Sequence, residues 1–296
     1  MSLISNLFSK KLLQPPAWLP SNTHYETVMG SEAYGVSQNS SDIDIYGFCI
    51  PPKETIFPHL GGEILGFGTP KTRFEQYQQH HIKDETTGKE YDISIYNIVK
   101  YFQLAMENNP NMLDSLFTPE YCVRHCTRVG RIVLDHRHLF PHKGCYHKFR
   151  GYAYSQLHKM KIKQPKEGSK RYEDVQKFGW DRKFGYHVVR LATEAEQLLE
   201  TGTLVLDQNK GMLKAIRAGE WTEEQVRQFF TDKEKHLEKL YETSKLPEYP
   251  DEEAIKTLLL NCLEEHYGNL NNCVAVSSRA EELVKRIKFL IESKGY

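Results

Sequence analysis

The chain has 296 residues, 39 % of them hydrophobic and 26 % charged, with a formal net charge of zero. Its length suits one large domain or two ordinary ones, and its composition is that of a globular protein with a sizeable core. No apolar run approaches the ~18 residues that cross a bilayer, and the six scattered cysteines, with no secretory signal, favour reduced thiols, so we predict a cytoplasmic protein with no membrane partner.

The first third of the chain carries short runs of apolar residues. Between residues 3 and 12 these recur at helical spacing, which predicts a short N-terminal helix. A second helix is expected to start over residues 31–35, after a Gly-Ser turn. Strands are predicted over residues 24–29, 42–50, 72–83 and 90–96, the last two joined as a hairpin.

From Asn97 onward the pattern becomes helical, with residues 164–176, rich in Lys, Gly and Pro, predicted as a loop. Helices are predicted over residues 97–107, 111–117, 129–139, 148–161, 182–200, 223–241, 252–266 and 278–291. The order of elements predicts an α+β protein. A small mixed-sheet domain over residues 1–120 is followed by a helical domain over residues 121–296.

Two aspartates separated by one residue give the clearest chemical signal. Residues two apart in a strand point the same way, so Asp42 and Asp44 share a face and the isoleucines beside them point to the core. The same alternation around Asp92 predicts a third carboxylate on the polar face of a later strand. Three carboxylates form a hard-oxygen site that suits Mg²⁺, with Mn²⁺ as the alternative, and two ions ~4 Å apart activate an attacking hydroxyl and stabilise a leaving pyrophosphate.

A Gly-Ser turn precedes the aspartate pair by eleven residues and predicts a phosphate site. Gly30 allows the backbone to approach a phosphate closely, and the N–H groups that follow attract the anion. The Ser31 hydroxyl can donate to a β- or γ-phosphate oxygen. Together the turn and the acids predict a site for a nucleoside triphosphate (NTP), with Asp92 as the base for the incoming hydroxyl.

The sequence resembles the DNA polymerase β nucleotidyltransferase superfamily. The resemblance lies in a Gly-Ser turn, an Asp-x-Asp pair and a third acid on a later strand. More narrowly, the chain resembles the predicted nucleotidyltransferases called RlaP, for RNA-ligase-associated protein, over roughly residues 24–206. The matching pieces are residues 30–47, 92–96, 109–111, 116–117, 151–156 and 187–191. The resemblance implies Mg²⁺-dependent nucleotidyl transfer, with a catalytic domain over residues 1–120 and a helical domain that completes the cleft for nucleotide and acceptor.

Lys183, His187 and Arg190 form a stripe on one predicted helix, at positions i, i+4 and i+7. The stripe either contacts the triphosphate or an acceptor phosphate across the cleft, or is the exposed side of an amphipathic helix. It belongs to a basic block, residues 143–190, with 13 Lys and Arg against 4 Asp and Glu, a local charge of +9. Aromatic residues interleave with these cations and suit either RNA stacking or core packing.

These observations predict an enzyme that moves a nucleoside monophosphate from an NTP to an acceptor and releases pyrophosphate. An RNA end, such as that of a tRNA, is the favoured acceptor, and a protein side chain or a small molecule is the alternative. A catalytically silent nucleotide-binding or RNA-binding module is the alternative of a different class. The intact trio of acids argues against it.

Overall fold

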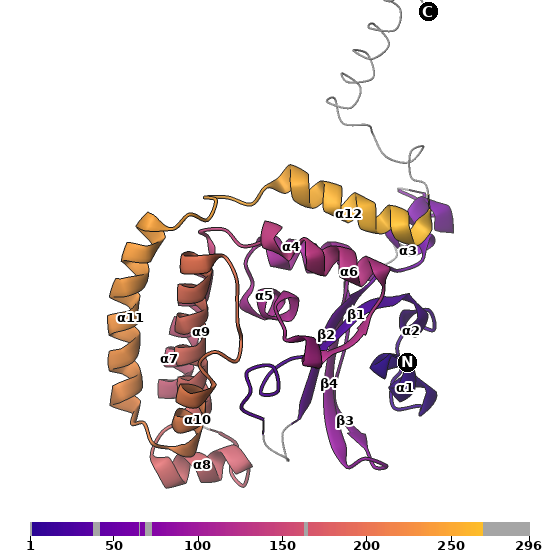
Figure 1. Ribbon diagram of the computed structural model, residues 1–296. Helices are drawn as coiled ribbons and strands as arrows, with labels where there is room; N and C mark the ends of the chain where they lie inside the picture. Colours follow the sequence, from indigo (N-terminus) through magenta and orange to yellow (C-terminus); the bar gives the residue numbers. More distant parts are fainter. Residues whose placement is uncertain (1, 38–41, 65, 69–72, 163–164, 269–296) are drawn as a thin grey trace, which may run out of the picture.

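The computed structural model describes residues 2–37, 42–64, 66–68, 73–162 and 165–268. A five-stranded mixed sheet carries helices on both faces, and long helices form a layer beside it (Figure 1). The predicted α+β arrangement is therefore confirmed. The helix predicted over residues 278–291 lies outside the described residues.

The sheet has the strand order β3–β4–β2–β1–β5. Its strands are β1 (Thr23–Val28), β2 (Ile43–Cys49), β3 (Gln76–Asp84), β4 (Lys89–Asn97) and β5 (Val123–Cys126). β2 and β4 run parallel, and the other neighbours are antiparallel. The four predicted strands and the β3–β4 hairpin are confirmed. β5 was not predicted, and because it follows residue 120 the sheet extends past the predicted domain boundary.

The two faces of the sheet belong to two hydrophobic cores. Ile45 and Ile93 lie in the core covered by α1 (Leu3–Ser9), and Phe48 lies in the larger core shared with the helical layer. Because side chains alternate along a strand, Asp44 and Asp92 are on the second face, toward the helices. The predicted division into apolar and acidic faces is therefore present on both strands.

Long helices make up most of the remaining chain. Figure 1 shows α7, α9 and α11 as a layer of neighbouring helices, and α9 packs against both of the others. The remaining bounds are α2 (Leu19–Asn22), α3 (Lys53–Ile56), α4 (Ile98–Met106), α5 (Pro110–Leu116), α6 (Arg128–Asp135), α7 (Cys145–Ile162), α8 (Lys170–Phe178), α9 (Arg182–Thr201), α10 (Lys210–Ala218), α11 (Glu223–Thr243) and α12 (Glu252–Tyr267), with short 3₁₀ helices at Pro58–Gly61, Glu120–Cys122 and Arg137–Leu139. In the described part of the chain, no helix has both the length and the apolar composition needed to cross a membrane.

Two local predictions were wrong. Most of the predicted loop 164–176 is α8, because Ser169 caps its first turn and Gly179, with a φ of 80°, ends it. The expected helix start at residues 31–35 is a single turn. Val36 N–H donates to the Ser31 carbonyl (2.8 Å), and Gly35 takes a φ of 66°, so the backbone turns away after one turn.

α12 returns from the helical layer to the sheet half of the protein. It packs across α4 and α6 (Figure 1), and its Leu258 and Cys262 belong to the same core as Tyr25 of β1. The Tyr267 hydroxyl donates to the Pro51 carbonyl. The two parts of the chain therefore share one continuous core.

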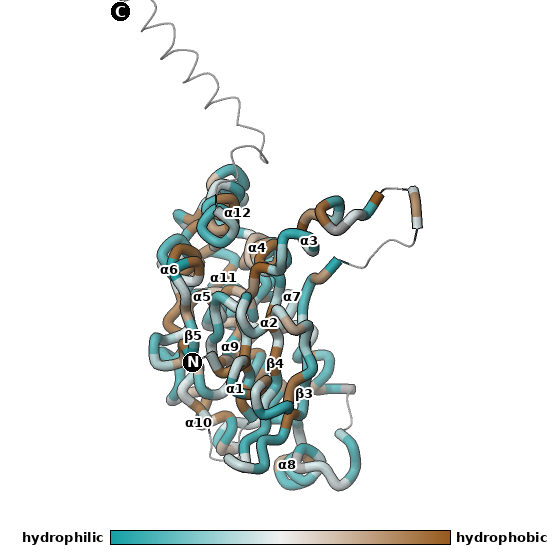
Figure 2. Tube along the Cα trace, turned by 90° about the vertical axis from the view of Figure 1, so that its right-hand side faces the viewer, coloured by the Kyte–Doolittle hydropathy of each residue, from teal (hydrophilic) through white to brown (hydrophobic). Residues whose placement is uncertain are grey.

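The segment after α3 extends away from the body of the protein (Figure 2). Its apolar side chains Leu60, Ile64 and Phe67 are 61–77 % exposed. The three acidic residues lie elsewhere, in a cleft between the sheet and the helices α8 to α10.

Candidate active site

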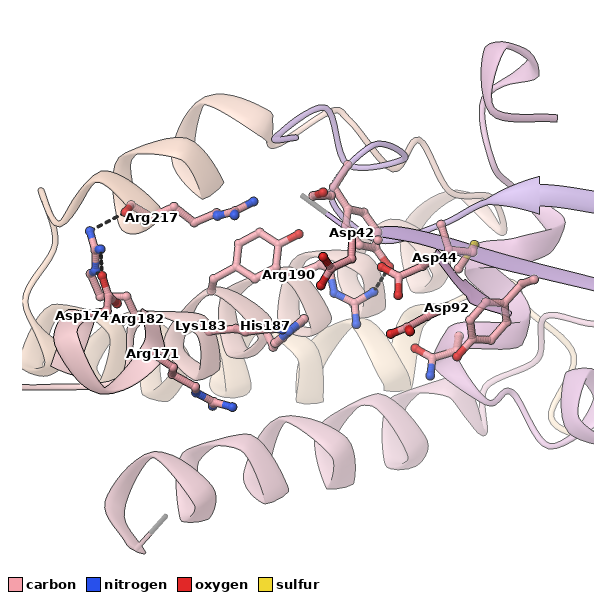
Figure 3. A pocket seen from close by; sticks show the side chains of 17 residues that line it. Asp42, Asp44, Asp92, Arg171, Asp174, Arg182, Lys183, His187, Arg190 and Arg217 are labelled. Carbon is pink, nitrogen blue, oxygen red and sulfur yellow. Dashed lines mark hydrogen bonds and ion pairs between the residues drawn. The ribbon is translucent and has the colours of Figure 1, made fainter. Parts of the chain in front are cut away.

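The three predicted acids line one cleft with a volume of about 640 Å³. Asp44 of β2 and Asp92 of β4 are register partners on adjacent parallel strands, a spacing of about 4.8 Å between backbones. Asp42 lies just before β2. Figure 3 shows the three carboxylates together on one side of the cleft.

Negative charge accumulates at these carboxylates. Burial raises the pKa of Asp44 to about 6, with a further increase from Asp92 and Asp42, while Lys183 opposes the shift. Within the described residues, no hydrogen-bond donor contacts the carboxylates of Asp42 or Asp44. Oxygen ligands with uncompensated charge are the donor set that binds a hard divalent cation, so the residues present fit Mg²⁺ or Mn²⁺.

The Gly30 turn lies directly against Asp44. Met29 N–H donates to the Asp44 carbonyl (2.7 Å), and Gly30 has a φ of 64°. A Cβ at position 30 would lie 2.2 Å from Asp44 Oδ2, so only glycine allows this approach. In the described part of the chain, the backbone N–H groups of Ser31, Glu32 and Ala33 have no acceptor, and Ser31 lines the cleft, where its N–H can meet an anion.

The opposite side of the cleft is basic. Figure 3 shows Arg171 and Arg217 directed toward the acids across the cavity, with His187 between the two groups, and Arg182 at the far end, turned to Asp174 and the Arg217 carbonyl. Each arginine is held in place: Arg171 by Asp181 (2.6 Å), Arg182 by Asp174, and Arg217 by the Val36 carbonyl (2.9 Å). Protein contacts therefore fix Arg171, Arg182 and Arg217 on the side of the cleft opposite the carboxylates. We call these three arginines the basic wall.

The sequence did not single out these arginines. Arg171 lies on α8, which was predicted as a loop, although the caps at Ser169 and Gly179 are visible signals. Arg182 follows the N-cap Asp181 of α9, next to the predicted Lys183. Arg217 lies on α10, for which no helix was predicted, and it reaches the cleft only through tertiary packing.

The predicted stripe on α9 divides into an exposed and a buried part. Lys183 is exposed, lines the cleft and has no ion pair in the described part of the chain. Arg190 also borders the cleft but is only 6 % exposed. Its guanidinium binds the Tyr34 hydroxyl and the Asp114 carboxylate, and contacts Glu194 at 3.3 Å. Arg190 thus joins the turn after Gly30 to α5 and α9.

His187 lies in the cleft between these two residues. Burial and the nearby Arg190, Lys183, Arg171 and Arg217 lower its pKa well below the ordinary value. The imidazole is therefore neutral at physiological pH, and it can exchange a hydrogen bond with a ligand but adds no positive charge.

The chain is similar to a solved structure and to a protein family. A nucleotidyltransferase-like protein from Exiguobacterium sibiricum, known from its crystal structure, shows 11 % sequence identity and a TM-score of 0.29 over 81 % of this chain and 73 % of its own. No curated protein matches the sequence. The profile of RlaP, the RNA repair pathway DNA polymerase beta family, matches residues 9–261. Since this match spans most of the chain, with the acids, the glycine turn and the basic wall all inside it, the protein belongs to the RlaP family.

Proposed function

We propose that the protein is a divalent-metal-dependent nucleotidyltransferase that transfers a nucleoside monophosphate from an NTP to an acceptor and releases pyrophosphate. The observation that carries the proposal is the cleft itself, where three converging carboxylates and the Gly30 turn face a basic wall. Membership of the polymerase β-type family supports a nucleotidyltransferase.

In this proposal Asp42, Asp44 and Asp92 hold the divalent cations. Bound there, Mg²⁺ or Mn²⁺ would neutralise the carboxylates and supply Lewis-acid activation of the attacking and leaving oxygens. Asp92 accepts the proton of the acceptor hydroxyl. On this side of the cleft, the protein itself holds the NTP and the acceptor hydroxyl in fixed positions relative to each other.

The remaining residues of the cleft bind the triphosphate. The free N–H groups after Gly30 and the Ser31 hydroxyl contact phosphate oxygens beside the acids. Across the cleft the cations Arg171, Arg182 and Lys183, with Arg217, stabilise the negative charge that passes to the departing pyrophosphate. Because the arginines are already held by protein partners, little reorganisation accompanies binding.

We propose an RNA end as the acceptor. Lys159, Lys161 and Lys166, from α7 and the segment before α8, are exposed and have no ion pair within the described residues. Unpaired cations beside a catalytic cleft suit a polyanion, because binding releases its counterions. The family's description as part of an RNA repair pathway is consistent with this acceptor.

The test is incubation with each α-labelled NTP, Mg²⁺, total RNA and cell extract, followed by separation of the labelled products. We expect label on RNA, with pyrophosphate release that Asp42→Ala and Asp44→Ala abolish. Label on a protein would favour a protein-modifying enzyme, and pyrophosphate without a labelled macromolecule would favour a small acceptor. Metal-dependent NTP binding without transfer would indicate a catalytically silent module. Metal-dependent NTP binding that is unchanged in Asp42→Ala and Asp44→Ala would show that these acids do not form the NTP site.

Gly30→Ala is expected to reduce transfer by about 100-fold, because the new methyl group displaces Asp44 or the turn by about 1 Å. Gly211→Ala is the matched control, since a Cβ at this position in α10 meets nothing within 4 Å. The control should keep full activity and gain up to about 1 kcal/mol of stability from helix propensity. Initial rates and thermal unfolding of both variants decide the outcome, and an active Gly30→Ala protein would contradict the geometry.

A further inference from the structure

A β-bulge interrupts the β3–β4 hairpin beside the active-site acids. The ladder pairs Gln79 with Ile93 and resumes with Ile82 opposite Tyr91. Two residues of β3, His80 and His81, therefore stand opposite the single residue Asp92. His81 takes a φ of 57°, a left-handed conformation that a non-glycine residue rarely adopts.

The bulge turns a backbone donor toward a carboxylate. Freed from the ladder, the His81 N–H donates to Asp92 Oδ1 at 2.7 Å, and His80 Nδ1 lies 3.6 Å from the same oxygen. Within the described residues, the other oxygen, Asp92 Oδ2, has no protein partner. The carboxylate is thus held through one oxygen, and the second is left for a ligand.

Packing does not account for this strained backbone. The side chains of His80 and His81 are 53 % and 78 % exposed, so the bulge buries neither ring. The His81 ring bonds Glu90 at 2.7 Å on the surface of the protein. Strained conformations that persist without burial are typical of functional sites, and bulges frequently re-aim groups beside active sites.

We propose that the bulge is a positioning device for Asp92, in which the His81 N–H fixes Oδ1 so that Oδ2 is aimed at the cation and the acceptor hydroxyl. This inference rests on the proposed function. Metal-binding carboxylates are commonly oriented by hydrogen bonds of this kind, and loss of such a partner lowers metal affinity or activity 10- to 100-fold. The carboxylates of Asp42 and Asp44 have no comparable donor in the described part of the chain.

Substitutions at position 81 separate the backbone donor from the side chain. His81→Gly and His81→Asn tolerate the left-handed conformation, so they should keep the bulge and bind Mn²⁺ like the wild type. His81→Val, whose branched side chain opposes that conformation, is expected to weaken Mn²⁺ binding and lower kcat about 10- to 100-fold. Mn²⁺ binding is measured on the metal-free full chain, and thermal unfolding confirms that each variant folds.

Lys11→Val is the matched control. Lys11 is also exposed and left-handed, with a φ of 60°, but it lies outside the cleft. The same strain there should leave Mn²⁺ affinity and kcat unchanged. A loss of Mn²⁺ affinity in Lys11→Val equal to that in His81→Val would overturn the proposal, because strain alone would then explain the effect.

A second measurement needs no variant at position 81. The amide resonance of His81 should shift upfield in Asp92→Asn, because the bond to an ionised acceptor is replaced by a weaker one. An unchanged His81 resonance, or Mn²⁺ affinity equal to that of the wild type in folded His81→Val, would refute the positioning role. The proposed function would still hold if Mn²⁺ binding by the wild type depends on Asp92. Failure of the proposed function gives a different result, in which Mn²⁺ binding by the wild type is independent of Asp92.

Discussion

Asparagine at position 44 is expected to abolish nucleotidyl transfer and, at the same time, to stabilise the metal-free protein at neutral pH. The pKa of Asp44 is raised from 3.8 to about 6, chiefly by burial and by Asp92. At pH 7.5 the folded protein therefore carries a carboxylate that the unfolded chain ionises more readily. Removing that charge should increase the free energy of unfolding by about 1–3 kcal/mol.

The sign of this effect gives it a pH window. A raised pKa means that the folded state binds the Asp44 proton more tightly than the unfolded chain does. The stability that this proton contributes is fully present below about pH 4 and is lost as pH rises through 6. Asp44→Asn should consequently match the wild type at pH 4 and exceed it at pH 7.5. Thermal unfolding with a chelator at both values checks this, and a variant less stable than the wild type at pH 7.5 would contradict it.

Metal binding should reverse the order of stability. Mn²⁺ stabilises the wild type because it binds the folded state, and Asp44→Asn should lose most of that increase. Since protons compete with the cation for Asp44, Mn²⁺ affinity of the wild type should fall as pH decreases through 6. The same residue thus lowers stability and supports activity, which is typical of a binding site.

Arg190→Met is expected to destabilise the protein by about 3–5 kcal/mol, because it leaves buried acids without their cation. Burial raises the pKa of both Asp114 and Glu194, and the Arg190 charge is the main group that opposes this increase. Lys183→Met, on an exposed neighbour of the same helix, should leave stability within about 0.5 kcal/mol. It should instead weaken NTP binding about 10- to 100-fold through the loss of one charge-assisted contact.

Urea unfolding and equilibrium NTP binding on both variants separate the two roles. Adding Asp114→Asn and Glu194→Gln to Arg190→Met should restore part of the lost stability, because no buried charge then remains unpaired. Arg190→Met with wild-type stability and weakened NTP binding would instead make Arg190 a direct ligand of the triphosphate.

Local patterns were sufficient to predict the acid-bearing strands. The alternation of Asp44 with Ile45 and of Asp92 with Ile93 predicts on which face of the sheet each side chain lies. This prediction depends only on the geometry of a strand. The parallel pairing that brings the two acids together is a tertiary property. Chemistry indicated only that the two strands are neighbours, since two carboxylates rarely suffice to bind two cations, and the parallel direction was not predicted.

The basic wall required tertiary contacts that no local pattern contains. The spacing of Lys183, His187 and Arg190 predicted that they share one helix face. It could not show that the Arg190 guanidinium binds Asp114 and Tyr34, which are more than 70 residues away in the sequence. Arg217 lies on the short helix α10, and only tertiary packing brings that helix to the cleft. In the same way, composition made residues 164–176 look like a loop, although their caps favoured a helix.

The return of α12 to the sheet has a consequence for synthesis of the chain. Leu258 and Cys262 complete the core that contains Tyr25, and Tyr267 is bonded to Pro51. During translation β1, which carries Tyr25, leaves the ribosome long before α12 exists. The part of the core around Tyr25 therefore stays incompletely covered until more than 200 further residues have been added, and chaperone binding to ribosome-bound chains should end when α12 emerges.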